Sequence, residues 1–129
     1  MGKPRRQSRN RTSTGVTVVT VRRLALALPG VEEGISYGTP AFRLRRVMLA
    51  RLREDGESLV IKVDRLEREM LMAADPQAFF ITDHYRDYPL MLVRLAAVRS
   101  DVLRELLEQA WRSAAPKRLA AARDRKRPG

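Results

Sequence analysis

Two short segments, Ser36–Pro40 and His84–Pro89, carry most of the side chains that could do chemistry. The second segment holds a histidine, two tyrosines and an arginine, which are residue types that stack on flat rings and bind phosphate. The same tyrosines could instead be half-buried, with their hydroxyls hydrogen-bonded inside the protein. The first segment has hydroxyls and a glycine, but it lacks the glycine-rich pattern and the lysine of a phosphate-binding loop. A turn is therefore the simpler interpretation of Ser36–Pro40.

The residue types that are scarce in this chain exclude several classes of catalysis. The chain has no cysteine and a single histidine, His84. Disulfides, zinc–thiolate sites and thiol catalysis are therefore excluded, and so are metal sites that need several imidazoles. No nucleophile motif accompanies His84. We therefore expect a protein that is not an enzyme and that has no metal site and no cofactor.

The basic residues suggest an anionic partner, and their distribution shows which parts of the chain would meet it. The 129 residues have a formal net charge of +11. Residues 1–31 hold seven basic residues and no acid, residues 112–129 hold seven against one acid, and residues 32–111 hold 12 against 14. The excess charge therefore lies at the two ends. Arginines there could contact phosphate, or they could reflect a composition bias.

A second group of basic residues lies on predicted strands. Because alternate residues of a strand point to opposite faces, the alternation predicts that these cations share the face that does not pack on the core. The predicted cationic face consists of Arg43, Arg45, Arg51, Arg53 and Lys62, and Arg94 could join it. Like charges on neighbouring strands repel each other, and a phosphate backbone would relieve that repulsion. The alternative is an ordinary solvated sheet face.

Periodicity predicts the elements that would position these side chains. Apolar residues at helical spacing predict three helices, at 16–28, 64–74 and 100–115. The second helix would be capped by Asp64 and would have Leu66, Met70 and Leu71 as its apolar stripe. Alternating or continuous apolar runs predict five strands, at 41–45, 47–53, 58–63, 79–81 and 89–98, and the alternation in the second strand places Met48 on the core side. Asp55-Gly56 predicts a tight hairpin between the second and third strands.

The order of these elements predicts an α+β domain. We expect one antiparallel sheet of about five strands, with three helices packed mainly on one face. The predicted domain spans residues 16–122, in which 117–122 could add a short helix. The polar, basic segments 1–15 and 123–129 are expected to be disordered tails.

Several motifs, in this order along residues 20–120, resemble the MmcQ/YjbR family. They are Leu28–Glu33, Ser36–Phe42, Ala50–Gly56, Leu59–Asp64, His84–Pro89, Ala110-Trp111 and Ala115–Leu119. The resemblance implies a frataxin-like or double-wing fold and a DNA-binding role, with no agreed catalytic residues. The family-like positions are Ser36, Tyr37, Gly38, Pro40, Lys62, Tyr85, Tyr88, Pro89, Trp111 and Lys117.

These observations favour a non-catalytic, cytoplasmic DNA-binding module without a membrane span. Its contacts to the phosphate backbone would come from the cationic face and the basic tails, with Tyr85, Arg86, Lys117 and Arg118 at the edges. The alternative is a protein-interaction or small-ligand module that uses the two loops. That alternative predicts a concave pocket lined by Ser36, Tyr37, Tyr85 and Tyr88.

Overall fold

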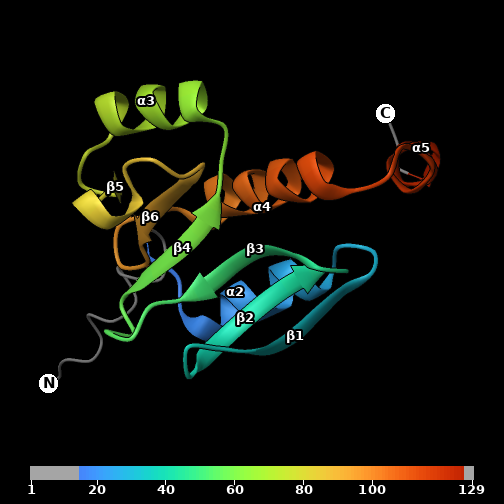
Figure 1. Cartoon of the computed structure of the whole chain (residues 1–129), viewed down its shortest axis with the longest axis horizontal. Coiled ribbons are helices and arrows are strands. Elements are labelled where there is room, and N and C mark those ends of the chain that lie inside the picture. Colours follow the sequence, from blue (N-terminus) through green and yellow to red (C-terminus); the bar gives the residue numbers. More distant parts are fainter. Residues whose placement is uncertain (1–14, 127–129) are drawn as a thin grey trace, which may run out of the picture.

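The computed structural model describes residues 15–126 of the chain. Four helices and six strands make up the described part, together with one short 3-10 helix (Figure 1). In chain order they are α2 (Val18–Leu26), β1 (Val31–Ser36), β2 (Thr39–Leu44), β3 (Val47–Leu52), β4 (Ser58–Lys62), α3 (Arg65–Ala74), β5 (Phe79–Phe80), η2 (Asp83–Tyr85), β6 (Leu90–Arg94), α4 (Ser100–Ala114) and α5 (Lys117–Lys126).

The strands form one antiparallel sheet in the order β1-β2-β3-β4-β6-β5. This arrangement confirms the predicted α+β class and the single antiparallel sheet. The sheet has one strand more than expected, because β1 was not predicted. Of its six residues only Val31 is buried, and Glu32, Glu33 and Gly34 are exposed. A polar edge strand of this kind carries almost no apolar alternation that a sequence could display.

The main core lies between one face of the sheet and the helices α2 and α4. Phe42, Leu59 and Ile61 from the strands are fully buried there, beside Val21 of α2 and Leu103 of α4. Trp111 of α4 is also fully buried. Its indole nitrogen donates a hydrogen bond of 2.8 Å to the carbonyl of Pro29, so that α4 is tied to the turn that follows α2.

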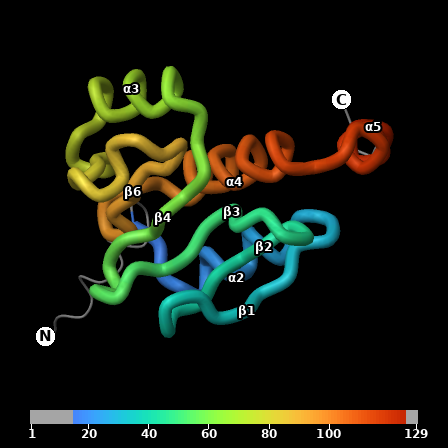
Figure 2. The backbone as a smooth tube through the Cα atoms, viewed as in Figure 1, coloured from blue at the N-terminus to red at the C-terminus, as the bar shows by residue number. Residues whose placement is uncertain are grey.

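Helix α3 lies over the β5–β6 edge of the sheet, at the top of the tube in Figure 2. The sequence predicted Leu66, Met70 and Leu71 as its apolar stripe, and this is wrong for two of them. Leu66 and Met70 are exposed, whereas Arg68 is buried and faces the body of the protein. The predicted capping by Asp64 is present, since its carboxylate accepts hydrogen bonds from the amides of Leu66 and Glu67.

The C-terminal helix α5 is longer than the sequence suggested. It continues to Lys126, so the predicted disordered tail at 123–129 is corrected over its first four residues. Ion pairs hold this part of α5 to α4: Arg123 binds the buried Glu108, and Arg112 bridges Glu108 and Asp124. The predicted tail at 1–15 lies outside the described residues except for Gly15, and so does 127–129.

No helix among residues 15–126 is long and apolar enough to cross a membrane. Within the same residues, no group of three or more acidic or histidine side chains is placed to hold a metal ion.

Candidate binding groove

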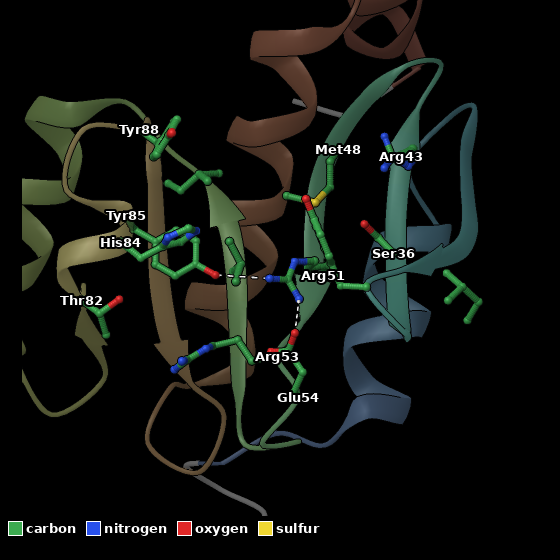
Figure 3. Close-up of a pocket in the computed structure, with 14 residues that line it drawn as sticks. Ser36, Arg43, Met48, Arg51, Arg53, Glu54, Thr82, His84, Tyr85 and Tyr88 are labelled. Carbon is green, nitrogen blue, oxygen red and sulfur yellow. Dashed lines mark hydrogen bonds and ion pairs between the residues drawn. The ribbon is translucent and has the colours of Figure 1, made fainter.

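An open groove of about 1000 Å³ crosses the face of the sheet that α2 and α4 leave uncovered. One wall is the tip of the β1–β2 hairpin, and the other is the loop that contains η2 (Figure 3). Strands β3 and β4 supply the floor between them. The two loops that the sequence selected as candidates therefore face each other across this groove, 44 or more residues apart in the chain.

The floor depends on a β-bulge in β3. Phe42 of β2 pairs with Ala50, but the next residue, Arg43, pairs with Met48, so Leu49 is the extra residue. The bulge lets Leu49 and Ala50 both face the core, and it turns Met48 to the groove side. The sequence prediction placed Met48 in the core, and this is wrong because a simple alternation cannot register the extra residue. Met48 instead lies beside Val60 and Leu90 in a small apolar cluster.

Arg51 is the most buried charged side chain of the groove, with 8% of its surface exposed. Its Nη1 donates to the carbonyl of Leu52 at 3.2 Å, and its Nη2 donates to the Tyr85 hydroxyl at 3.2 Å (Figure 3). The Glu54 carboxylate lies 3.7 Å from Nη1, and the guanidinium lies 4.9 Å from the centre of the Tyr37 ring. Arg51 thus connects the two walls of the groove from below.

The hairpin wall ends in a two-residue turn, Tyr37-Gly38. Both residues have positive φ angles, 54° and 79°, as a type I′ turn requires. Glycine adopts this conformation readily, but for tyrosine it is strained. Thr39 supports the turn, because its hydroxyl donates to the carbonyls of Ser36 and Leu52. The result is a Tyr37 side chain that is 80% exposed and is held beside Arg51.

The opposite wall is held in place by a buried arginine that the sequence analysis missed. Arg68 of α3 donates to four carbonyls of the loop, those of Tyr85, Arg86, Tyr88 and Leu90, at 2.8 to 3.3 Å. Arg65 adds a hydrogen bond to the carbonyl of Asp87. The available signal was positional: Arg68 lies one helical turn before Leu71, on the side of α3 that packs inward.

The aromatic side chains of this wall lie at different depths. Tyr85 is buried against Val60 and Leu92, with its hydroxyl reaching Arg51. His84 is exposed and meets the Tyr85 ring edge-on, with the ring centres 4.8 Å apart. Tyr88 is 53% exposed at the rim of the groove. The loop therefore offers one anchored aromatic ring and two accessible ones.

The expected cationic face is present only in part. Arg43, Arg51 and Arg53 line the groove, but Arg53 also contacts Asp55 at 3.7 Å. Arg45 lies in the β2–β3 turn with a φ of 58° and is not on the groove face, and Lys62 lines a separate cavity with acidic neighbours. The prediction that five cations form one uncancelled face is therefore corrected.

The remaining predicted cations lie outside the groove. Arg94 donates to the carbonyls of Pro76 and Gln77 and stacks on Phe80 at 4.0 Å, and Arg86 pairs with Asp83. Lys117 and Arg118 are exposed in the first turn of α5. Arg118 lines a second cavity with Arg45, about 470 Å³ in volume.

The four side chains predicted to line a pocket do lie together. Ser36 and Tyr37 are on one wall of the groove, and Tyr85 and Tyr88 are on the other. This places the residues of the alternative hypothesis in one site.

Comparison with known proteins identifies the family. The YjbR family model matches residues 26–113, a segment that contains both walls of the groove. A crystal structure of a Deinococcus radiodurans protein with a DUF419 domain superposes with a TM-score of 0.67 at 26% identity, over 82% of each chain. Uncharacterized proteins of Mycobacterium tuberculosis and Mycobacterium bovis are 44% identical to this chain over an aligned segment of 52 residues. That segment covers 40% of this chain and 40% of each relative. The match therefore spans about two fifths of the length of these relatives. With more than half of its length matched by the family model, the chain belongs to the YjbR family.

Proposed function

We propose that this protein is a non-catalytic binding module and that its site is the groove between the β1–β2 hairpin tip and the η2 loop. The occupant is a small molecule. The observation that carries the proposal is the convergence of Tyr37, His84, Tyr85 and Tyr88 from two distant segments onto one concavity with an apolar floor. Concave sites with aromatic linings and a few fixed polar groups are typical of ligand binding.

The volume and the chemistry of the groove support this assignment. Its volume of about 1000 Å³ lies at the upper end of the range of roughly 300 to 1000 Å³ that is usual for small-molecule sites. Arg68 fixes one wall through four hydrogen bonds, so that wall is preformed and needs little ordering on binding.

DNA binding is a second candidate, and a different part of the molecule favours it. Arg45 and Arg118 line one cavity near exposed Lys117, and the described residues that line this cavity include no carboxylate. The sequence adds seven basic residues and no acid in 1–31. DNA would therefore meet the α5 end and the basic ends of the chain rather than the groove, and its affinity would fall steeply with salt.

The groove assignment can be tested with a ligand screen by thermal shift at low and high salt. Compounds that raise the Tm of the wild type at both salt concentrations should lose affinity about tenfold in Tyr37→Ala, because an aromatic contact contributes roughly 1 to 3 kcal/mol. Leu66→Ala is the matched control, since it removes an exposed apolar side chain from α3 outside the groove. If the compounds bind Tyr37→Ala as tightly as they bind the wild type and Leu66→Ala, the groove assignment is overturned.

A further inference from the structure

The groove holds a buried positive charge that its neighbours compensate only in part. Arg51 is 8% exposed, yet its two hydrogen-bond acceptors, the Leu52 carbonyl and the Tyr85 hydroxyl, are neutral. Among residues 15–126, the one carboxylate within ion-pair range of Arg51 is that of Glu54, at 3.7 Å, and the Glu54 side chain is 65% exposed to water. A charge removed from water is stabilised when an opposite charge and full hydrogen bonding accompany it. Glu54 is too solvated to supply this fully.

The hydrogen bonding around Arg51 leaves donors for a ligand. A guanidinium has five N–H groups, and the described contacts use one on each Nη atom. The Tyr85 hydroxyl accepts from Nη2, so its own proton is free to be donated to another acceptor. Arg51 and Tyr85 therefore present adjacent donors on the groove floor (Figure 3).

Positive charges outnumber negative charges around the floor. Among the described residues that line the groove, three guanidiniums (Arg43, Arg51 and Arg53) stand against one carboxylate, Glu54, and the Asp55 carboxylate outside the lining lies 3.7 Å from Arg53. Low-dielectric walls on both sides strengthen the resulting field. The groove therefore favours a ligand with a negatively charged group.

The rest of the groove favours a flat ring. Tyr37 and Tyr88 offer accessible aromatic faces on opposite walls, and Met48, Val60 and Leu90 provide an apolar surface between them. Stacking on such rings tolerates many ring types, so it selects for flatness and not for one compound.

We infer that the groove binds a small ligand with a flat ring and an anionic group, a carboxylate or a phosphate, and that Arg51 is the residue that binds the anion. This inference rests on the proposed function and specifies the chemistry of the occupant. Tyr85 supplies the second donor, and the ring lies between the aromatic walls. Arginine suits this position because its planar fork matches both oxyanions with two parallel hydrogen bonds.

Two matched pairs of probes test the inference on the full chain by calorimetry and NMR. The first pair is 2-naphthoate and 2-naphthamide, and the second is adenosine monophosphate and adenosine. Each pair keeps the ring and removes the charge, and the two pairs distinguish carboxylate from phosphate. In at least one pair the charged probe should bind about tenfold more tightly than its neutral partner, as a charge-assisted bidentate contact provides.

Substitutions at the floor then identify the contact. Arg51→Gln should reduce the preference for the charged probe to about twofold or less, and Arg51→Lys should retain part of it, since an ammonium keeps the charge without the fork. If Arg51→Gln does not fold, Tyr85→Phe replaces it as the test variant, because it keeps the aromatic ring and removes one hydrogen-bond donor. This substitution should lower the preference for the charged over the neutral probe severalfold. Arg104→Gln, an exposed arginine on α4, is the matched control and should change nothing.

The outcomes separate this inference from the proposed function. If the charged and neutral probes bind equally and shift the resonances of groove residues, the anion inference is overturned while the groove remains a binding site. If the preference for the anion survives Arg51→Gln, Arg51 is not its binding residue and the inference fails. If neither pair binds at millimolar concentration, the inference also fails, and the ligand screen with Tyr37→Ala alone decides the groove assignment.

Discussion

At the scale of single residues, burial decides what each arginine does. Arg51 and Arg68 are largely removed from water, whereas Arg86, Arg104 and Arg118 are exposed. Arg68 donates hydrogen bonds to the loop carbonyls, and its Nε atom has no hydrogen-bond partner in the described structure. Arg51 lies at the groove floor with weak compensation. The burial of an arginine side chain must therefore be known before that arginine is proposed to contact a ligand.

Arg68→Met should loosen the wall of the groove. The substitution keeps much of the side-chain volume but leaves four loop carbonyls without their donor, at an expected cost of roughly 2 to 4 kcal/mol in unfolding free energy. Hydrogen exchange of the amides in 83–90 should accelerate, and groove ligands should bind more weakly. Glu69→Met, on the exposed side of α3, is the control. Unchanged exchange in 83–90 would show that Arg68 does not hold the loop.

At the scale of elements, the groove depends on how two local irregularities are placed. The bulge at Leu49 turns Met48 toward the groove, and the tight turn at Tyr37-Gly38 holds an aromatic ring above Arg51. Both features redirect side chains without changing which strands pair. Small departures from regular sheet geometry thus build the site.

Helix α5 should depend on Glu108 for its attachment to α4. Glu108 is buried and binds Arg112 and Arg123, and its hydrogen bond and charge raise the pKa of Arg123. Glu108→Gln should lower the unfolding free energy by roughly 1 to 3 kcal/mol, because it removes the buried carboxylate that binds the partly buried guanidinium of Arg123 and one of the two carboxylates that bind Arg112. Denaturant unfolding and hydrogen exchange over 117–126 measure this effect. Glu105→Gln, exposed on the same helix, should behave as the wild type.

Elements with local signals were predictable from the sequence. The β3–β4 hairpin at Asp55-Gly56 is present, because its geometry is set by a few adjacent residues: Gly56 has a φ of 71°, and Asp55 accepts from the amides of Glu57 and Ser58. The two loops that were selected by residue type both line the groove. Their position on one groove is now a structural observation, whereas their function stays a prediction.

Features set by tertiary context were not predictable. Strand β1 pairs along its whole length with β2, yet its own residues are mostly polar. The bulge at Leu49 is visible only as a shift in pairing, and the inward direction of Arg68 depends on the carbonyls of a loop 17 to 22 residues away. Each of these is decided by a partner segment that a local pattern does not contain.

At the scale of the whole molecule, charge is distributed unevenly between the body and the ends. The net charge of +11 arises from residues 1–31 and 112–129, whereas the segment between them has slightly more acids than bases. Within the described structure, several arginines of the segment between the ends are also paired with acids. A polyanion would therefore be attracted mainly to the ends, and the groove retains its own local field.

The stability of the whole molecule should fall in acid. Hydrogen bonds from the Glu57 amide and its neighbours lower the pKa of Asp55 below its ordinary 3.8, and Arg22 lowers that of Glu33 below 4.5. Because these pKa values are lower in the folded state, the stabilisation is complete above the ordinary values and is lost as the pH falls through the folded-state values. Asp55→Asn should be less stable than the wild type at pH 7, and its stability should depend less on pH below about 4.

Urea unfolding between pH 2 and pH 7 checks this prediction. Glu32→Gln is a suitable control, because it removes an exposed carboxylate from β1 for which no ion pair is described. A pH dependence that is the same in Asp55→Asn and in the wild type would contradict the assignment.

The most direct test of the groove as the binding site is an NMR titration of the full chain with both probe pairs at physiological salt. We predict saturable shifts of the Tyr37, Arg51, Tyr85 and Tyr88 resonances, and in at least one pair these shifts should be much smaller with the neutral probe. Shifts confined to Arg45, Lys117 and Arg118, or responses that are identical for the charged and the neutral probe in both pairs, would contradict the account of an anion held at the groove floor.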